Sequence, residues 1–191
     1  MKHPFAPLLN LWHILKKILR YIGIALAAFV GIGLLLPGKA HVERQTTIAA
    51  SAPLVFDQIN ELKNWVNWSP WHQLDPNARW TYSTPSTAGI GAWYVWEGDK
   101  NTVGSGKMTI LDADSTKILH CKMEFSGSAD SFADFKLTAK DSTATTVVWT
   151  FDTDHGLNPV ARWFGLGLEK FIGPDYTEGL ANLKKVCEKP K

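Results

Sequence analysis

The sequence predicts an α+β domain in which a curved antiparallel sheet of seven strands wraps around one long C-terminal helix, with a single transmembrane helix in front. Three observations predict this arrangement. Residues 21–36 form an apolar run without a charge, strand-like segments of alternating polarity fill residues 41–153, and an amphipathic helical pattern occupies the remainder. A large sheet must bury one face, and the last helix is the only long element left to cover it.

The N-terminal apolar run is long enough to be a membrane span. With its neighbours it forms a segment at 18–38, close to the roughly 20 residues needed to cross a hydrocarbon core. Lys2, Lys16, Lys17 and Arg20 all precede the uncharged run, and no acidic residue accompanies them. The positive-inside rule therefore predicts that residues 1–17 are cytoplasmic and that the following domain lies outside the cytoplasm.

Two other interpretations of this segment stay open beside a retained signal anchor. A cleaved signal peptide requires small residues before the cleavage point, for which Gly38-Lys39-Ala40 is a candidate. A buried core helix requires other parts of the chain to cover an apolar surface on all sides. The anchor is favoured because the segment before the apolar run is long.

From His41 onward, turn-forming residues recur between strand-like segments, as in successive antiparallel hairpins. Ser51 followed by Pro53 predicts the start of a short helix, and a second helical piece carries Trp65 and Trp68. Clusters of Asp, Asn, Ser, Gly and Pro separate the strand-like runs. The predicted strands are 41–49, 79–83, 91–97, 103–111, 117–126, 132–140 and 144–153.

The predicted C-terminal helix follows Asn158-Pro159, with an interruption expected at Gly173-Pro174. Its apolar stripe consists of Tyr176, Leu180, Leu183 and Cys187 at helical spacing. Gly179 lies on the same stripe, where a core-filling helix would carry a side chain. This glycine favours open space between helix and sheet, although a close contact between the two would explain it equally well.

Three groups of residues resemble segments of one protein superfamily. Residues 64–71, Asn-Trp-Val-Asn-Trp-Ser-Pro-Trp, followed by Asp75-Pro76, resemble the stretch after its short helices. Residues 89–92 with Trp96 and Gly98, and residues 103–106, resemble its paired central strands, and residues 172–184 resemble its final helix. Residues 41–188 are thereby identified as a member of the SRPBCC superfamily (START/Bet v 1-like), similar to bacterial polyketide cyclase/dehydrase and lipid transport-type members. The resemblance implies a helix-grip fold with a cavity but does not choose among the superfamily's functions.

Alternation along the predicted strands separates an apolar face without charges from a polar one. The apolar face carries Met108, Ile110, Leu119, Cys121, Met123, Phe125, Phe135, Leu137, Val147, Trp149 and Phe151. Such a face suits a hydrophobic ligand, and it would equally pack an ordinary core. The candidate ligand-binding residues are Trp96, Met108, Phe125, Phe135, Trp149, Phe151, Trp163, Tyr176 and Leu180.

Three tryptophans lie beside the predicted cavity mouth, at Trp65, Trp68 and Trp71. Two of them are expected to plug the end of the sheet. The third is left open to contact a ligand or a bilayer interface, since an indole ring has an apolar body and a polar edge.

The sequence carries no motif of catalysis, metal binding or cofactor binding. Its six histidines have no metal-ligand spacing, and the serine in residues 104–106 lacks the fifth-position glycine of a nucleophile elbow. We therefore expect no catalytic residue, metal or cofactor, although enzyme activity is not excluded. The candidate loop residues His72, Asp75, Asp154 and His155 are expected to be solvated.

The charge distribution and the two cysteines bear on the protein's partners and on its thiol chemistry. Beyond residue 20, 16 basic residues face 18 acidic ones without a basic stripe, so nucleic acid is not an expected partner. Cys121 and Cys187 lie on surfaces predicted to face each other. They are expected either to form a disulfide or to remain two buried thiols, with the thiols slightly favoured.

The leading hypothesis is a module that binds or transfers a hydrophobic small molecule, such as a lipid, a quinone or a polyketide-like compound. Residues 18–38 would contact the membrane, which in a bacterium would be the inner membrane, with the domain on its extracytoplasmic side. Two alternatives stay open. One is a protein-interaction module whose cavity is filled, and the other is a cyclase or hydrolase that uses loop residues.

Overall fold

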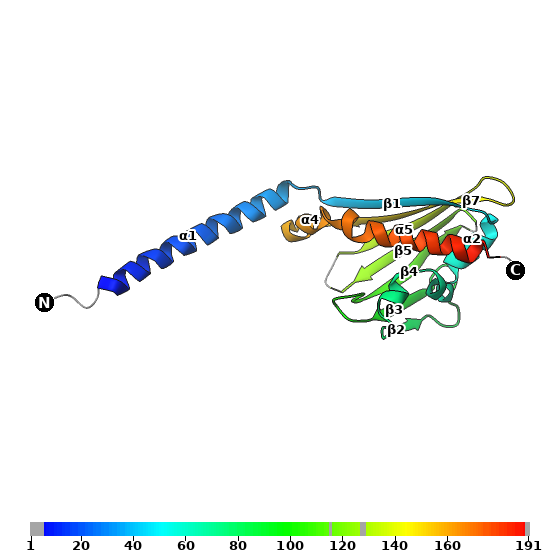
Figure 1. Ribbon diagram of the computed structural model, residues 1–191, viewed down its shortest axis with the longest axis horizontal. Coiled ribbons are helices and arrows are strands. Elements are labelled where there is room, and N and C mark those ends of the chain that lie inside the picture. The colour runs from blue at the N-terminus through cyan, green and yellow to red at the C-terminus, as the bar shows by residue number, and fades with distance from the viewer. Residues whose placement is uncertain (1–5, 115, 127–128, 190–191) are drawn as a thin grey trace.

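The computed structural model describes residues 6–114, 116–126 and 129–189 of the 191-residue chain. A long N-terminal helix projects from the domain and contacts it near the helix's C-terminal end (Figure 1). In chain order the elements are α1 (Ala6–Leu35), β1 (Lys39–Ile48), α2 (Ala52–Asn60), the 3-10 helix η1 (Leu62–Asn67), α3 (Trp71–Leu74), β2 (Arg79–Tyr82), β3 (Trp93–Glu97), β4 (Ser105–Asp114), β5 (Ile118–Phe125), β6 (Ser131–Ala139), β7 (Thr145–Asp154), α4 (Pro159–Gly165) and α5 (Leu168–Cys187).

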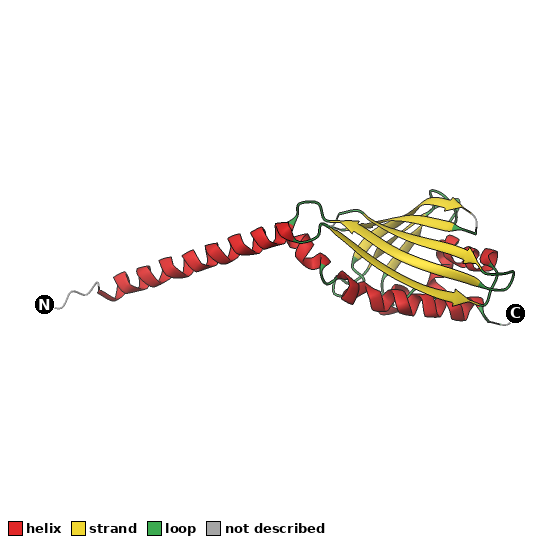
Figure 2. Cartoon of the chain, turned by 90° about the horizontal axis from the view of Figure 1, so that it is seen from above, coloured by secondary structure: helices red, strands yellow, loops and turns green. Residues whose placement is uncertain are grey.

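The sheet confirms the predicted fold class. Its seven strands run in the order β1-β7-β6-β5-β4-β3-β2, and each neighbouring pair is antiparallel. Strands β2 to β7 follow one another as hairpins, whereas β1 pairs with β7 at the far edge. Strand β1 is therefore separated in sequence from its partner by the short helices and the five intervening strands. The strands form one curved layer, and α5 lies along one face of it (Figure 2).

The inward face of the sheet is the one that alternation predicted. Phe135 on β6 and Val147 on β7 are fully buried, and Trp149 is 2% exposed. On the same face Met123 and Phe125 of β5 are only partly buried, although they pack against the core. The apolar face is thus completely covered over one part of the sheet and incompletely covered over another.

The C-terminal helix differs from its prediction at Gly173-Pro174. Helix α5 runs without interruption through both residues, and the break lies earlier, at residues 166–167 between α4 and α5. A proline inside a helix removes one backbone hydrogen bond, which the helix tolerates when packing compensates. Gly173 provides such packing, because a Cβ atom there would lie 2.3 Å from Nη2 of Arg44.

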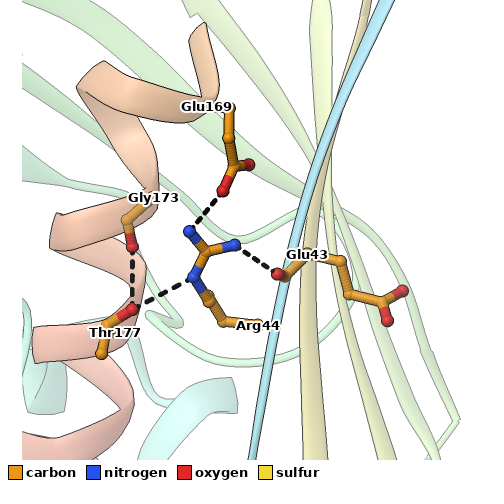
Figure 3. Close-up of polar contacts among 5 residues, drawn as sticks. All are labelled: Glu43, Arg44, Glu169, Gly173 and Thr177. Atoms are coloured by element: carbon orange, nitrogen blue, oxygen red, sulfur yellow. Dashed lines mark hydrogen bonds and ion pairs between the residues drawn. The ribbon is translucent and has the colours of Figure 1, made fainter.

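Arg44 of β1 fastens the first half of α5 to the edge of the sheet (Figure 3). Its Nη2 bonds to Oε1 of Glu169 at 2.5 Å, its Nε donates to Oγ1 of Thr177 at 3.1 Å, and its Nη1 donates to the Glu43 carbonyl at 2.7 Å. Thr177 in turn donates to the carbonyl of Gly173 at 3.0 Å. These bonds set where α5 lies relative to β1.

The two cysteines are free thiols, and both are buried. Burial raises the pKa of Cys187 to about 11, and it raises the pKa of Cys121 as well. Of the two expected states, the structure therefore has the pair of thiols rather than the disulfide. Buried, protonated thiols are poor nucleophiles, so neither is suited to redox chemistry.

Helix α1 contains an apolar stretch, Leu11–Leu35, that is long and apolar enough to cross a membrane. Its mean hydropathy is 2.1, and only 6% of its most apolar window is buried against the rest of the described chain. The core-helix interpretation is therefore wrong, because the described part of the chain leaves this surface exposed except where α4 contacts it.

Candidate functional site

A cavity of about 680 Å³ lies between the sheet and the helices α4 and α5. This volume falls within the roughly 300–1,000 Å³ of small-molecule sites. The aromatic lining residues are Trp65, Trp71, Trp80, Tyr94, Trp96, Phe125, Trp149, Phe151, Phe164, Phe171 and Tyr176. The polar lining residues are Thr102, Ser131, Thr153, His155, Asn158 and Asp175. We refer to this space as the cavity.

The cavity occupies one end of the groove between sheet and helix. Its sheet residues come from β2 and β3, and from the end of β5, the start of β6 and the second half of β7. Its helical residues come from η1, α3, α4 and the first half of α5. Helix α4 also packs against α1, so this end of the groove is the one nearest the N-terminal helix (Figure 1).

The structure brings five of the nine candidate ligand-binding residues to the cavity wall. These are Trp96, Phe125, Trp149, Phe151 and Tyr176. Three others, Met108, Phe135 and Leu180, are at most 2% exposed and belong to the packed core. They share the inward face with the lining residues, and alternation alone does not separate core from cavity along a strand.

Trp163 lies outside the cavity, contrary to the expectation. Its ring stacks on that of Phe29 with centroids 5.4 Å apart, and its Nε1 donates to the Phe29 carbonyl at 3.0 Å. Trp163 therefore joins α4 to α1. The expectation failed because this helix has a second packing partner, which the domain sequence does not reveal.

Gly179 marks close packing rather than open space. A Cβ atom at this position would lie 2.8 Å from Cζ3 of Trp149 and 3.3 Å from Cδ of Pro70. The Trp149 ring also stacks on Tyr176, with centroids 3.9 Å apart. Of the two explanations for this glycine, the close helix–sheet contact is the one that the structure has.

The three tryptophans beside the cavity divide as expected into two plugs and one open position. Trp65 and Trp68 are 2% and 0% exposed, and their indole nitrogens donate to the Ile59 and Gln58 carbonyls at 2.9 and 3.2 Å. Trp71 is partly buried, lines the cavity and packs edge-on against Trp149. Trp65 also contributes an edge to the cavity wall.

The prediction included Trp96 but missed Trp80 and Tyr94, which form an aromatic wall with it on β2 and β3. Trp80 and Trp96 are register partners with ring centroids 6.3 Å apart, and Tyr94 packs 5.4 Å from Trp80 and 5.8 Å from Trp96. Tyr94 lies two positions before Trp96, so period-two spacing was a signal for it. That signal was weak because all four residues 93–96 are apolar or aromatic.

The prediction also missed the part of the cavity wall that α4 and the start of α5 form. Phe164, Leu168, Phe171 and Ile172 line the cavity from this side. Their spacing shows an apolar helical surface, but no local signal tells which part of that surface faces the sheet, the solvent or another helix.

The helix supplies a charged group that the sheet lacks. Asp175 of α5 is the one carboxylate among the cavity-lining residues within the described part of the chain. Burial raises the pKa of this carboxyl, while a hydrogen bond from the Trp71 side chain partly offsets that rise and Glu178 adds to it. Burial also raises the pKa of Tyr94 and of Tyr176, so both remain neutral phenols. Among the described lining residues there is no Lys or Arg, so an anionic ligand group would lack a cationic partner here.

His72, Asp75, Asp154 and His155 were expected in solvated loops, but only Asp154 is exposed. His72 lies in α3 and Asp154 at the end of β7. Asp75 is 9% exposed and accepts bonds from the Asn77 and Asp99 amides at 3.0 and 2.8 Å. The ring of His72 stacks on that of Trp80 with centroids 3.7 Å apart, and burial lowers the pKa of His72 to about 4. His155 lines the cavity with its Nε2 buried. Across the described ranges, no three His, Cys, Asp or Glu side chains converge as a metal site.

The comparisons with known proteins agree with this architecture. The family described as polyketide cyclase/dehydrase and lipid transport matches residues 39–188. No curated protein matches the sequence.

Solved structures share the fold at low sequence identity. A norcoclaurine synthase from Thalictrum flavum, bound to a transition-state analogue, has a TM-score of 0.58 at 11% identity over 78% of this chain and 94% of its own. An aromatase/cyclase from a Streptomyces species has a TM-score of 0.53 at 16% identity over 78% of this chain and 94% of its own. A protein from Thermobifida fusca has a TM-score of 0.53 at 21% identity over 76% and 91%. Because the family match covers most of the chain, the protein belongs to the polyketide cyclase/dehydrase and lipid transport family, with the Bet v 1-like helix-grip fold of the SRPBCC superfamily.

Proposed function

We propose that this chain binds a neutral, hydrophobic small molecule in the cavity and that α1 holds the domain at a membrane. The observation that carries the binding proposal is the open space of about 680 Å³ with aromatic walls inside an otherwise packed domain. Burial of a ligand's apolar surface there gains roughly 25 cal/mol per Å². An interaction module with a filled cavity does not account for this space.

The walls suggest what kind of ligand fits. Aromatic rings favour a flat or aliphatic molecule, and the described lining offers no Lys or Arg to pair with a carboxylate or phosphate. A neutral lipid, a quinone or a polyketide-like compound meets both conditions.

The anchoring proposal has independent support. Apart from its contact with α4, the Leu11–Leu35 stretch is not covered by the described rest of the chain, and the basic residues Lys16, Lys17 and Arg20 lie toward its N-terminal end. Lys39 and Ala40 are already part of β1, paired with Asp154 and Thr153 of β7. Cleavage after Ala40 would remove two paired residues of the edge strand, which favours a retained anchor. The proposed topology is a cytoplasmic N-terminus in a bacterial inner membrane and an extracytoplasmic domain.

Photolabelling of the full-length protein in phospholipid nanodiscs tests ligand binding. The probe is a long-chain alcohol that carries a photoactivatable diazirine, and mass spectrometry maps the labelled peptides. We expect label in the peptides of β6, β7 and α5 that line the cavity. The variant Ala133→Phe places a large ring into the cavity from β6, and we expect it to lower this labelling at least ten-fold.

The matched control is Ala139→Phe, an exposed position on the same strand, which should leave the labelling within two-fold. Circular dichroism checks that both variants fold. Equal labelling of the cavity peptides in the two variants, or label confined to α1, would refute binding in the cavity.

A further inference from the structure

Helix α4 is fastened to the side of α1 well before α1 ends. Trp163 donates its indole hydrogen to the Phe29 carbonyl at 3.0 Å, and Arg162 Nη1 donates to the carbonyls of Leu34 and Leu36 at 2.6 and 3.1 Å. Gly33 allows this approach, because a Cβ atom there would lie 2.8 Å from Cβ of Pro159. The two helices therefore form a fixed pair rather than a domain on a loose tether.

The position of this contact along α1 determines its depth. Phe29 precedes Leu35 by six residues, which is about 9 Å along a helix axis. Phe29 therefore lies inside both the Leu11–Leu35 stretch and the predicted span 18–38, and not beyond the end of either. In a membrane, Trp163 and the part of α4 that packs on α1 would then lie at the level of the apolar stretch rather than above the membrane surface.

The surface around α4 is unusually apolar for a region exposed in a folded domain. Five large apolar side chains within residues 157–171 are more than half exposed, namely Leu157, Val160, Phe164, Leu166 and Phe171. The other exposed large apolar side chains of the described domain are scattered singly from residue 66 to residue 132. A cluster of this kind marks a surface that contacts an apolar partner. We call these five residues the apolar rim.

Two residues of the apolar rim also form part of the cavity wall. The rings of Phe164 and Phe171 are stacked with centroids 5.7 Å apart, and both line the cavity. Each residue is nevertheless 61% exposed. This aromatic pair therefore separates the cavity from whatever covers the rim.

We infer that the apolar rim docks into the bilayer that holds α1 and that the cavity exchanges its ligand directly with the membrane between Phe164 and Phe171. The bilayer is the partner favoured by the geometry, because the rim is continuous with α1 and lies at the level of its apolar stretch. The inference rests on the proposed function and adds the source of the ligand to it. A molecule that follows this route never crosses water, so the ligand class is a neutral molecule that partitions into lipid.

Depth measurement on the full-length protein tests the docking. Val160 is exposed and does not line the cavity, so Val160→Cys carries an environment-sensitive nitrobenzoxadiazole label in vesicles of phosphatidylcholine and phosphatidylglycerol. The matched control is Val66→Cys, a comparably exposed valine on η1. Spin-labelled phosphatidylcholine, with its label near the headgroup, should quench the first dye at least three-fold and leave the second nearly unchanged. Equal quenching at the two positions would overturn the inference.

A pair of glycines on α1 tests whether its contact with α4 sets the depth. Gly33→Leu inserts a side chain where Pro159 and Trp163 pack, whereas Gly31→Leu meets no atom within 4 Å. Both changes make the span equally more hydrophobic. We expect Gly33→Leu to reduce the quenching of the Val160 label by at least half and Gly31→Leu to leave it unchanged. The same effect from both glycines would argue against a fixed helix pair.

Loading from the membrane is tested with the photoactivatable alcohol already dissolved in the vesicles. The double variant Leu157→Asp with Val160→Asp alters two rim residues that do not line the cavity. We expect cavity labelling at short times to slow at least five-fold, with the same final extent. An unchanged rate would refute the membrane route. Failure of the proposed function looks different, because cavity peptides would then stay unlabelled in the wild type as well.

Discussion

The groove between the sheet and α5 is packed at one end and open at the other, although the same strands and the same helix build both ends. At the packed end Leu119, Phe135 and Leu183 are fully buried. At the open end Met123 and Phe125 are only partly buried, and Phe171 of α5 is mostly exposed. The difference shows that the cavity is a local property of this groove rather than a general consequence of the fold.

The inward face of β6 explains much of this difference. Along the strand it presents Ser131 and Ala133 first and then Phe135 and Leu137, so small side chains precede large ones. Opposite the large residues, Gly179 of α5 has no side chain, and the ring of Trp149 packs directly against it. Facing the small ones, α4 and the start of α5 carry aromatic side chains that turn partly outward. The open end therefore results from small strand residues opposite a helix that does not fill the space.

The largest difference between the two ends should appear in stability. Leu183→Ala removes a fully buried side chain from the packed end, and such truncations lower the free energy of unfolding by about 2–5 kcal/mol. Phe171→Ala at the open end removes a mostly exposed ring and should lower it by about 1 kcal/mol or less. Chemical denaturation of both variants in detergent, followed by near-ultraviolet circular dichroism, makes the comparison. Similar losses would show that the cavity closes around Phe171 in solution.

Gly179→Ala should give the next largest effect. Alanine favours a helix over glycine by about 1 kcal/mol, but its Cβ would lie 2.8 Å from the Trp149 ring. Because that ring is held between Tyr176 and Phe135, we expect overpacking to prevail and the free energy of unfolding to fall by about 1–2 kcal/mol. Glu178→Ala, an exposed neighbour, is the control and should change stability little. A stabilised Gly179→Ala would mean that open space remains at this level of the groove.

The last predicted effect concerns the wall of the open end and depends on pH. Burial lowers the pKa of His72 from 6.5 to about 4, and neither ring nitrogen has a hydrogen-bond partner among the described residues. As the pH falls from 6.5 to 4, the unfolded chain takes up a proton before the folded one, so stability decreases across this window. One pKa unit corresponds to about 1.4 kcal/mol, and for this partly exposed ring we expect a total loss of about 1–2 kcal/mol.

His72→Phe retains the stacking on Trp80 and removes the titrating group. Thermal unfolding at pH 7 and at pH 4.5 should therefore differ less in this variant than in the wild type. If both proteins lose stability by the same amount, His72 does not carry this part of the pH dependence.

The sequence by itself determined the fold class, the position of all seven strands to within a few residues, and the inward face of the sheet. These features follow from local patterns, since alternation specifies which side of a strand is buried and helical spacing specifies the stripe of Tyr176, Leu183 and Cys187. The apolar N-terminal helix was equally evident, because a long uncharged run is itself a local property.

Only the tertiary structure decided which end of the groove is open and which residues line it. A cavity depends on the fit between two surfaces that lie far apart in sequence, and the same glycine on a helix admits either empty space or a neighbouring ring. At Gly179 the space is taken by the neighbouring ring of Trp149. Trp163 packs against α1 rather than the sheet, because helix α4 has both as neighbours. Local patterns tell which residues are apolar, but not which apolar surface each will meet.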